Sequence, residues 1–416
     1  MDSGEKKTAT EPDKSTGDRA LVLALLALAS GHMLSTLLRT IPALSLDLMA
    51  SDFGTLPQTL ASLTSIYHFA FAAAQIPAGA AMDRFGVRPV SLGLLGGTVI
   101  GATLSGLATG PLTFLIGQLM LGVATSGMLM CPMTLAAKRV SVARFGLWSG
   151  MILSVGNVGM LLSSSPLAWV IEQYGWRAGF WVSAVYGVIV IAAVFVLVPG
   201  EKESHVVHGS PLSGMAEVLR LGLSRRLRGI IALSLVSLAA SLVLRGLWAG
   251  PWLMDVKGLS RIEAGNALGL YTIALIIGPL LIGVLDRTIG HRRSVIATAH
   301  LVAALLLVLM AAGAPHYFVS NLFGVAMMPP AYDLVLFVLI GFAVSAPALL
   351  FGMTSQLVEP QNAGKALSAV NLAFFLGAAL MQSSSGIVAV AYGLPAVLVF
   401  MALGLLVGSI VFLVYT

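Results

Sequence analysis

Long apolar runs recur from one end of this 416-residue chain to the other, and they constrain its fold more than any other feature. Each run has 18 or more residues with few charges, which is long enough to cross ~30 Å of hydrocarbon as a helix. The runs are continuous and do not alternate between polar and apolar residues, which excludes a membrane β-barrel. With 58% hydrophobic and only 10% charged residues, the chain also lacks the polar surface of a soluble domain. The sequence therefore predicts an all-α membrane protein.

Twelve spans are predicted, six on each side of a polar connection that is rich in charge, proline and glycine. They run roughly over residues 20–50, 57–81, 89–108, 111–137, 144–171, 176–198, 229–254, 262–284, 294–313, 331–357, 363–390 and 393–415. The domain organisation follows from this grouping. We expect a disordered cytoplasmic N-terminus (1–19), a six-helix bundle (20–199), a cytoplasmic linker (200–228) and a second six-helix bundle (229–416).

Lysine and arginine gather in alternate connections between the spans. One side receives the basic residues of the N-terminus, the linker and several short turns, whereas the other receives only Arg177, Lys257 and Arg261. By the positive-inside rule, both termini are cytoplasmic. The net charge of +6 therefore reflects membrane orientation, and no nucleic-acid partner is expected. The lipid bilayer is the expected surrounding, with the bacterial inner (plasma) membrane as location.

The two halves repeat one another. "LLRTIPALSLDLM" and "VLRGLWAGPWLMDV" each place an arginine in the first span of a half, before a short outer loop. The next cytoplasmic turn then reads "GAAMDRFGVRPV" in the first half and "GVLDRTIGHRRSV" in the second. Two six-span halves in parallel repetition are typical of secondary transporters, whose site lies between the halves.

Both cytoplasmic turns combine glycine, an Asp-Arg pair and further arginine, in Gly79, Asp83, Arg84, Gly86 and Arg88 and again in Asp286, Arg287, Gly290 and Arg292. This pattern resembles the signature loop of the major facilitator superfamily (MFS), and the resemblance covers nearly the whole chain after residue 20. It implies the MFS fold of 12 transmembrane helices in two pseudo-symmetric six-helix bundles, and a monomer. It also implies a gating role for these turns, which in the superfamily hold the halves together when the outside is open.

Some positions depart from the family pattern. Span four carries Gln118 where many members have an arginine, and span five has Ser165 before its proline and lacks the paired glycines of drug/proton antiporters. These departures weaken the case for a multidrug exporter. His300 is expected to be peripheral, because span nine usually faces lipid in this superfamily. Trp252 is expected at the outer interface.

The arginines in the two repeated segments, Arg39 and Arg245, are the most informative residues. A charge at mid-membrane costs at least ~2.5–3.5 kcal/mol, so it usually faces a cavity and has a function. By the parallel repeat, the two guanidinium groups should face each other across a central cavity. Asp47 and Asp333 are expected near the outer surface, which leaves no central carboxylate to neutralise either arginine.

Two uncompensated arginines attract anions, and their planar forks suit carboxylate or phosphate. Both segments are similar to those of MFS branches that move organophosphates or organic anions, which place arginines in spans one and seven. The resemblance implies that Arg39 and Arg245 bind a small anionic substrate. The alternative interpretation is that each arginine bonds to backbone carbonyls, or to a neighbour such as Gln75, and holds helices together.

Other residues are candidates around the same site. His32 lies two turns before Arg39 on one helical face, and Tyr67 and His68 are placed to face the cavity from span two. Histidine titrates near physiological pH, so His32 and His68 are candidates for proton coupling, although a hydrogen-bonded interior histidine is at least as good an interpretation for each. Further substrate contacts are predicted for Asn157, Asn371 and Trp248, the last either walling the site or lying at the outer interface.

No enzyme motif is present: the chain has no P-loop, no H-E-x-x-H pattern and no plausible Ser/His/Asp set. No cofactor and no metal are expected, so transport would be secondary. We expect rocker-switch alternating access for a small organic anion (a carboxylate or a phosphate ester), as anion exchange or as proton-coupled transport. The alternatives are an exporter of amphipathic drugs, siderophores or lipids, and a membrane binding or sensor protein that does not transport.

Overall fold

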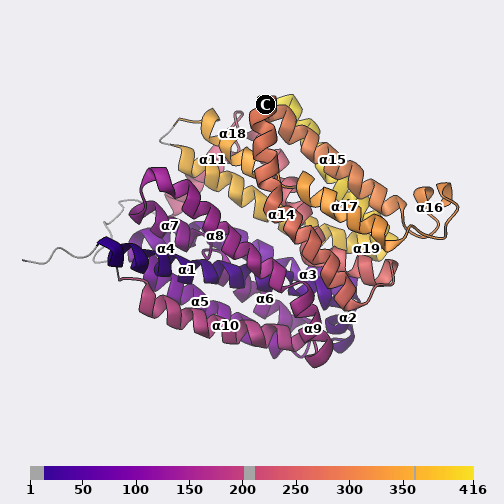
Figure 1. The fold of residues 1–416 in the computed structure, drawn as a ribbon, viewed down its shortest axis with the longest axis horizontal. Coiled ribbons are helices and arrows are strands. Elements are labelled where there is room, and N and C mark those ends of the chain that lie inside the picture. Colours follow the sequence, from indigo (N-terminus) through magenta and orange to yellow (C-terminus); the bar gives the residue numbers. More distant parts are fainter. Residues whose placement is uncertain (1–13, 201–210, 360–361) are drawn as a thin grey trace, which may run out of the picture.

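The computed structural model describes residues 14–200, 211–359 and 362–416, and all regular elements in these ranges are helices (Figure 1). The predicted disordered N-terminus falls mostly on residues 1–13, and the first part of the predicted linker on 201–210; both lie outside the described residues. The first helix begins at Lys14, six residues before the predicted start of span one.

Residues 14–200, the described part of the N-terminal half, contain ten α-helices. They are α1 (Lys14–Thr40), which continues as the 3-10 turn η1 (Ile41–Leu44), then α2 (Leu46–Asp52), α3 (Pro57–Thr64), α4 (Ile66–Phe85), α5 (Val87–Gly106), α6 (Pro111–Thr125), α7 (Met130–Arg139), α8 (Val142–Leu162), α9 (Ser165–Tyr174) and α10 (Trp176–Leu197). Several breaks fall inside a span, as between α8 and α9. A broken helix at membrane depth exposes backbone groups that need partners, so these breaks are places to look for function.

The C-terminal half follows α11 (Pro211–Gly222), a helix within the predicted linker. It contains α12 (Arg228–Val243), the π-helical η2 (Leu244–Trp248), α13 (Ala249–Pro251), the π-helical η3 (Trp252–Val256), α14 (Arg261–Ile289), α15 (Arg292–Ala312), α16 (Phe318–Leu322), α17 (Pro330–Ala343), α18 (Pro347–Leu357) and α19 (Ala363–Tyr415). The seventh span is therefore wound partly as π-helix, a form that is rare and frequently found at functional sites.

Ten segments of the described chain are long and apolar enough to cross a membrane. One of them, Gly364–Tyr415, holds two helices that meet at Gly393, whose φ of 79° interrupts the helix. Helices α3 and α4 together form a further, less apolar crossing. The twelve crossings of the predicted membrane fold are therefore present.

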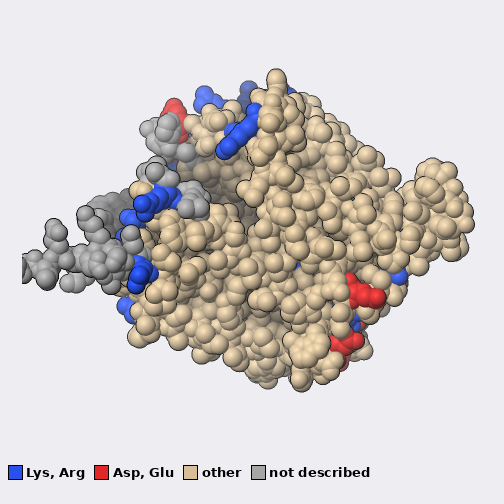
Figure 2. Space-filling model, in the orientation of Figure 1, with Lys and Arg blue, Asp and Glu red and all other residues tan. Residues whose placement is uncertain are grey.

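The two halves lie side by side as separate groups of helices, one running from indigo to magenta and the other from orange to yellow (Figure 1). Basic side chains gather at the end of the molecule where the chain begins and ends, and acidic side chains appear at the opposite end (Figure 2). We call these the basic end and the far end. The surface is hollowed between the halves toward the basic end (Figure 2).

Candidate functional site

A small cavity lies where the two halves meet, and most of its lining is polar. Its volume is about 10 Å³, enough for about one water molecule. Polar residues from both halves line it: Arg39, Thr64, Tyr67, His68, Gln118 and Gln382. The site is thus nearly closed in this conformation, and it contains three of the residues that the sequence predicted, Arg39, Tyr67 and His68.

Arg39 brings a positive charge to this cavity with no negative charge beside it. It makes no ion pair or hydrogen bond with any residue that the structure describes. Instead its guanidinium carbon lies 5.9 Å from the ring centre of Phe71 and 5.8 Å from that of Phe375. A cation over an aromatic face gains about 0.5–2 kcal/mol, which is much less than a paired carboxylate would provide in a dry site.

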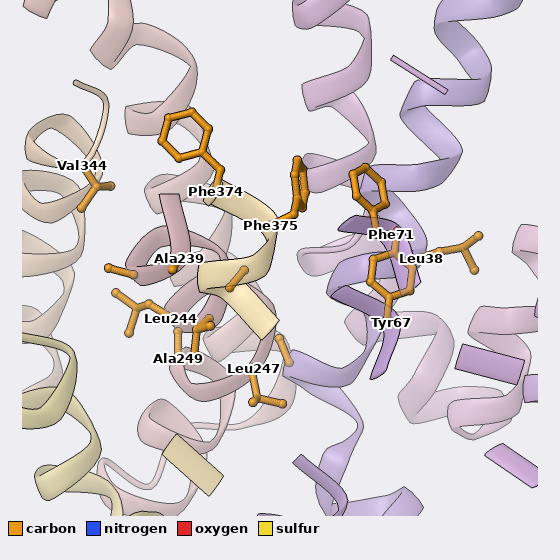
Figure 3. Close-up of a cluster of buried hydrophobic side chains, with 14 of the residues drawn as sticks. Leu38, Tyr67, Phe71, Ala239, Leu244, Leu247, Ala249, Val344, Phe374 and Phe375 are labelled. Carbon is orange, nitrogen blue, oxygen red and sulfur yellow. The ribbon is translucent and has the colours of Figure 1, made fainter. Parts of the chain in front are cut away.

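Phe71 and Phe375 also join the two halves. Their ring centres are 4.1 Å apart, with Phe71 on α4 and Phe375 on α19. Figure 3 shows the two rings facing each other, with Tyr67 and Leu38 beside Phe71. Phe71 follows Tyr67 on α4 by about one helical turn, and Phe375 precedes Gln382 on α19 by about two turns. Both rings therefore lie on the basic-end side of the polar cavity. The aromatic pair therefore closes the cavity on that side.

His68 is buried beside Arg39 and is left without a partner. It is 4% exposed, and neither ring nitrogen has a hydrogen-bond partner among the described residues. An unsatisfied buried polar group costs ~1–3 kcal/mol, so such a group usually has a function. The other polar residues here are paired: the Tyr67 hydroxyl lies 2.6 Å from that of Thr125, and the Gln382 amide donates to Thr64 across the halves at 2.6 Å.

Arg245 occupies the equivalent place in the second half, in the π-helical segment η2, but its surroundings differ. It is 1% exposed and does not line the cavity. Its Nε donates to Thr272 at 2.9 Å, and its Nη2 donates to the Met160 carbonyl at 2.7 Å and to the Ser164 hydroxyl at 2.9 Å. Only Nη1 is buried without a partner among the described residues.

The position of Arg245 explains how its charge is tolerated. The Met160 carbonyl belongs to the last turn of α8, which ends at Leu162 where the fifth span breaks. The last carbonyls of a helix lack intrahelical partners and carry partial negative charge. The Nη2 group of Arg245 therefore satisfies the broken end of α8 from the opposite half, while Nη1 stays without a partner among the described residues. The two guanidinium groups do not share one cavity, although the repeat led us to expect them to face each other.

The remaining predicted residues are distributed around this centre. Trp248 is buried and donates its indole N–H to Ser385 at 2.8 Å. His32 is buried against α8, where a Cβ on Gly156 would overlap its ring. Asn157 and Asn371 are half-buried, and no hydrogen bond of either side chain is found within the described ranges. None of these four residues lines the small cavity.

The two Asp-Arg turns share a glycine of positive φ but differ in ψ, which is 166° at Gly86 and 2° at Gly290, and in their contacts. Gly86 and Gly290 end α4 and α14 with φ of 84° and 71°, which favours glycine in both places. In the second half, Asp286 accepts from Arg292 at 2.8 Å. In the first half, Asp83 is exposed and Arg88 instead donates to the Phe195 carbonyl at 2.6 Å.

The other residues of these turns lie nearer the surface. Arg84 and Arg287 are exposed, and the Arg84 guanidinium lies 5.1 Å from the Phe85 ring centre. Gly79 is half-buried, and a Cβ there would lie 3.2 Å from Met130. Each of these contacts stays within one half of the molecule.

The far end is closed by contacts between the halves. Arg261 donates to both carboxylate oxygens of Asp47, at 3.1 and 2.6 Å, and also bonds to the Leu44 carbonyl. Nearby, Gly250 approaches the Ala43 carbonyl so closely that a Cβ would overlap it. These contacts join the first span to the seventh and eighth, so the molecule is closed at the far end and hollowed toward the basic end.

Two sequence interpretations are wrong in detail. Trp252 is not at a lipid interface: it is 1% exposed and donates to Asp333 at 2.8 Å. Asp333 lies near the far end but is fully buried, and it pairs with Lys257 at 2.9 Å. His300 does not face lipid either, because it is buried and bonded to Ser237 on α12 at 2.5 Å.

Sequence reasoning missed several residues that line the cavity or lie beside it. Phe71, Phe375 and Thr64 resemble ordinary residues of an apolar helix, and no local pattern distinguishes them. Gln118 was noticed only as a departure from a family pattern, whereas it lies on the cavity with Arg39. Gln382 gave the clearest available signal, since it is an amide within an apolar span.

Comparison with known families and structures agrees with this architecture. Residues 28–249 and 231–416 match the family model described as "Major Facilitator Superfamily". Over nearly the whole chain the fold is similar to two crystal structures of the nucleoside transporter NupG. The TM-scores are 0.73 and, for a mutant, 0.74, at 15% and 14% identity, covering 95% of this chain and 98–99% of theirs.

Curated relatives match over shorter stretches. A tetracenomycin C resistance and export protein from Streptomyces glaucescens is 25% identical over 46% of this chain and 36% of its own length. A methylenomycin A resistance protein from Bacillus subtilis (strain 168) is 24% identical over 50% and 44%. A multidrug resistance protein B homolog from Mycobacterium tuberculosis is 26% identical over 39% and 30%. The match thus spans less than half the length of each of these relatives.

Proposed function

The chain belongs to the Major Facilitator Superfamily, and we propose that it is a secondary transporter that moves a small organic anion. The family and the fold imply a transporter rather than an enzyme. The observation that carries the substrate class is Arg39, a guanidinium at a buried cavity between the halves with no carboxylate to neutralise it. A carboxylate or a phosphate ester supplies the missing charge and matches the guanidinium fork.

The rest of the cavity suits an anion with further hydrogen-bonding groups. His68 offers unpaired ring nitrogens beside Arg39, and Gln118 and Gln382 add amides that now donate to Ser105 and Thr64. The cavity must widen before a substrate fits, since it now holds about one water molecule. Parting Phe71 from Phe375 would widen it toward the hollow. Asn157, Asn371 and Trp248 are proposed to contact the substrate only in such a wider state.

We propose alternating access because contacts between the halves close the cavity on both sides: Asp47 with Arg261 at the far end, and Phe71 with Phe375 toward the basic end. We place the basic end at the cytoplasm, with both termini and α11 on that side, in the bacterial inner membrane. The structure is then inward-facing, with Asp47 and Arg261 closing the outer side. We also place the domain boundaries at 20–199 and 229–416, expect a monomer, and assign the Asp-Arg turns to closure of the cytoplasmic side.

Transport is proposed to be coupled either to protonation of a histidine or to the exchange of one anion for another. The cavity lining contains His68 and no carboxylate. Proton-coupled transport would therefore charge and discharge His68, with His32 as the further candidate on α1. Anion exchange needs no such group, because the second anion neutralises Arg39 on the return step.

A second candidate function is export of an amphipathic compound. The names of the curated relatives favour it, since all three are resistance proteins and one is also an export protein. It predicts that Arg39 is held by the two aromatic rings as a structural group and that apolar compounds, rather than anions, bind to the protein.

Thermal unfolding of the purified protein in detergent distinguishes these functions. A panel would contain carboxylates, phosphate esters, nucleosides and apolar drugs, run against wild type, Arg39→Gln and the exposed control Arg144→Gln. A ligand at 100 times its Kd stabilises by about 2.7 kcal/mol, or ~3 °C for a chain of this size. We expect an anion to stabilise wild type and Arg144→Gln but not Arg39→Gln. Stabilisation of all three proteins by apolar drugs alone would instead support the exporter.

A further inference from the structure

Two polar side chains of the small cavity are left without partners, and both belong to the N-terminal half. Arg39, on α1, makes no ion pair or hydrogen bond with any described residue, and it contacts two aromatic rings instead. His68, on α4, has no hydrogen-bond partner at either ring nitrogen within the described chain. The other polar side chains of the lining are already bonded within the protein: Thr64, Tyr67, Gln118 and Gln382.

The imidazole of His68 is held in place by its neighbour. Its ring lies edge-on to that of Tyr67, with 5.2 Å between the ring centres, and the Tyr67 hydroxyl is itself fixed by Thr125 at 2.6 Å. A phenylalanine would pack against Tyr67 in the same way. Burying ring nitrogens without partners is costly, so the polar ring is informative. It indicates a ligand group that bonds to a nitrogen of His68.

The two unpaired groups are close together and stay so. The cavity that both of them line has a volume of about 10 Å³, so the ligand groups that they contact must be neighbours in the ligand. Helices α1 and α4 belong to the same half, so parting the halves leaves the spacing between Arg39 and His68 unchanged. Gln382 and Phe375 lie on α19 of the other half and would move away.

The cavity offers one positive charge. Among the described residues that line it, Arg39 alone is charged beside the neutral imidazole of His68. Arg245 does not line it and donates to Met160 and Ser164 instead. One carboxylate balances Arg39, whereas a second carboxylate or an ammonium group would be buried without a counter-charge. The charge count therefore favours a monoanion over dianions and amino acids.

We propose that the site selects a 2-hydroxy monocarboxylate, with its carboxylate on the guanidinium of Arg39 and its adjacent hydroxyl on a ring nitrogen of His68. This inference rests on the proposed function and narrows its substrate class. A hydroxyl can donate and accept, so it pairs with that nitrogen in either tautomer of the imidazole. Arg39 then binds the charge, and His68 is a specificity-determining residue that distinguishes hydroxy acids from plain carboxylates.

Four ligands on one three-carbon skeleton test the proposal with purified protein in detergent. Lactate has the hydroxyl, propionate lacks it, alanine carries an ammonium group in its place, and tartronate has a second carboxylate in place of the methyl group. Thermal unfolding at increasing ligand concentration gives each apparent Kd. Lactate should bind to wild type about tenfold more tightly than propionate, because losing the hydroxyl leaves His68 unpaired. Alanine and tartronate should bind at least about tenfold more weakly than lactate.

Variants of His68 separate selectivity from stability. His68→Phe keeps a ring beside Tyr67, so it should bind propionate as wild type does and bind lactate no better than propionate. His68→Gln retains a donor and an acceptor and should keep part of the preference. His291→Phe, at an exposed histidine, is the control that should change neither ligand. Arg39→Gln should lose both, and a merely structural role of His68 would leave the ratio of the two affinities unchanged.

The outcomes distinguish this inference from the proposed function. Equal binding of lactate and propionate by wild type, tighter binding of tartronate, or a full lactate preference in His68→Phe would overturn the inference and leave anion binding at Arg39 intact. Binding of another organic anion without binding of lactate would do the same. Folded wild type that binds no anion at all would overturn both. If His68→Phe does not fold, the ligand series on wild type decides alone.

Discussion

Arg39 and Arg245 occupy the same place in a repeated sequence, yet the structure gives them opposite surroundings. Arg39 lines a polar cavity, where its guanidinium contacts the rings of Phe71 and Phe375 and forms no ion pair with any described residue. Arg245 is fully buried and donates to Thr272, Met160 and Ser164. One charge is left open to a ligand, whereas the other is used inside the protein.

The difference comes from the helices that carry them. Helix α1 is regular up to Thr40, whereas the seventh span becomes π-helical at Leu244–Trp248. That segment carries the guanidinium of Arg245 to the broken end of α8 in the other half. We therefore propose that the sequence symmetry conceals two functions, with Arg39 binding the substrate and Arg245 holding one arrangement of the halves.

The largest effect is expected at Arg39. Arg39→Gln removes the unneutralised charge of the cavity, so anion binding should fall about 30-fold or more, since truncating a buried charge pair costs about 2–5 kcal/mol. Arg39→Lys should retain part of the affinity because the charge stays while the planar fork is lost. Equilibrium binding of the stabilising anion measures both. An unchanged affinity in Arg39→Gln would make the cation–aromatic contact structural.

Arg245→Gln should act on stability more than on affinity. Its loss removes hydrogen bonds to the end of α8, but Thr272 and Ser164 keep their own bonds to the Leu268 and Met160 carbonyls. We expect destabilisation by about 1–3 kcal/mol and a change in anion affinity below about tenfold. Thermal unfolding with and without anion separates the two quantities. A 100-fold loss of affinity with unchanged stability would return Arg245 to the substrate site.

The closure at the far end should respond moderately. Asp47→Asn breaks the ion pair with Arg261 that joins the halves, which should favour opening at that end. Ser383, whose carbonyl accepts from Ser62 of the other half, offers a reporter position. In a Ser383→Cys protein with Cys131→Ser, thiol labelling should speed up about fivefold, equivalent to about 1 kcal/mol. Asp52→Asn is the matched control, since Asp52 pairs within its own half; equal acceleration in both variants would refute the closure.

The smallest effect, a change in stability at acid pH, is expected from replacing Asp52 itself. The Trp176 indole and then the Arg177 guanidinium lower the pKa of this carboxyl from its ordinary value of 3.8. A lowered folded-state pKa contributes stability that is present above pH 3.8 and is lost as pH falls below it. Because the carboxyl is 45% exposed, the contribution should stay below about 1 kcal/mol. Acid unfolding of Asp52→Asn should therefore differ little from wild type, and a large difference would contradict this.

The fold was predictable because membrane physics leaves few choices. Apolar runs of the right length must be helices, and the Asp-Arg-Gly turns repeat with their positive φ at Gly86 and Gly290. Arg39, Tyr67 and His68 were also predictable, since polar groups in an apolar span need a cavity.

The rest depends on contacts between distant segments. Arg245 meets Ser164 across 81 residues, and Phe71 meets Phe375 from the other half. The π-helical winding of the seventh span has no signature that hydropathy detects. Lys257 and Asp333 look like two loop charges, because only the folded chain shows that they pair in a buried place.

The most direct test of the distinction between the two arginines is uptake of the stabilising anion into proteoliposomes by Arg39→Lys and Arg245→Lys. If Arg39 meets the anion, Arg39→Lys should raise KM at least about tenfold, whereas Arg245→Lys should lower kcat and leave KM within about threefold. The reverse pattern, with KM raised only by Arg245→Lys, would contradict the account.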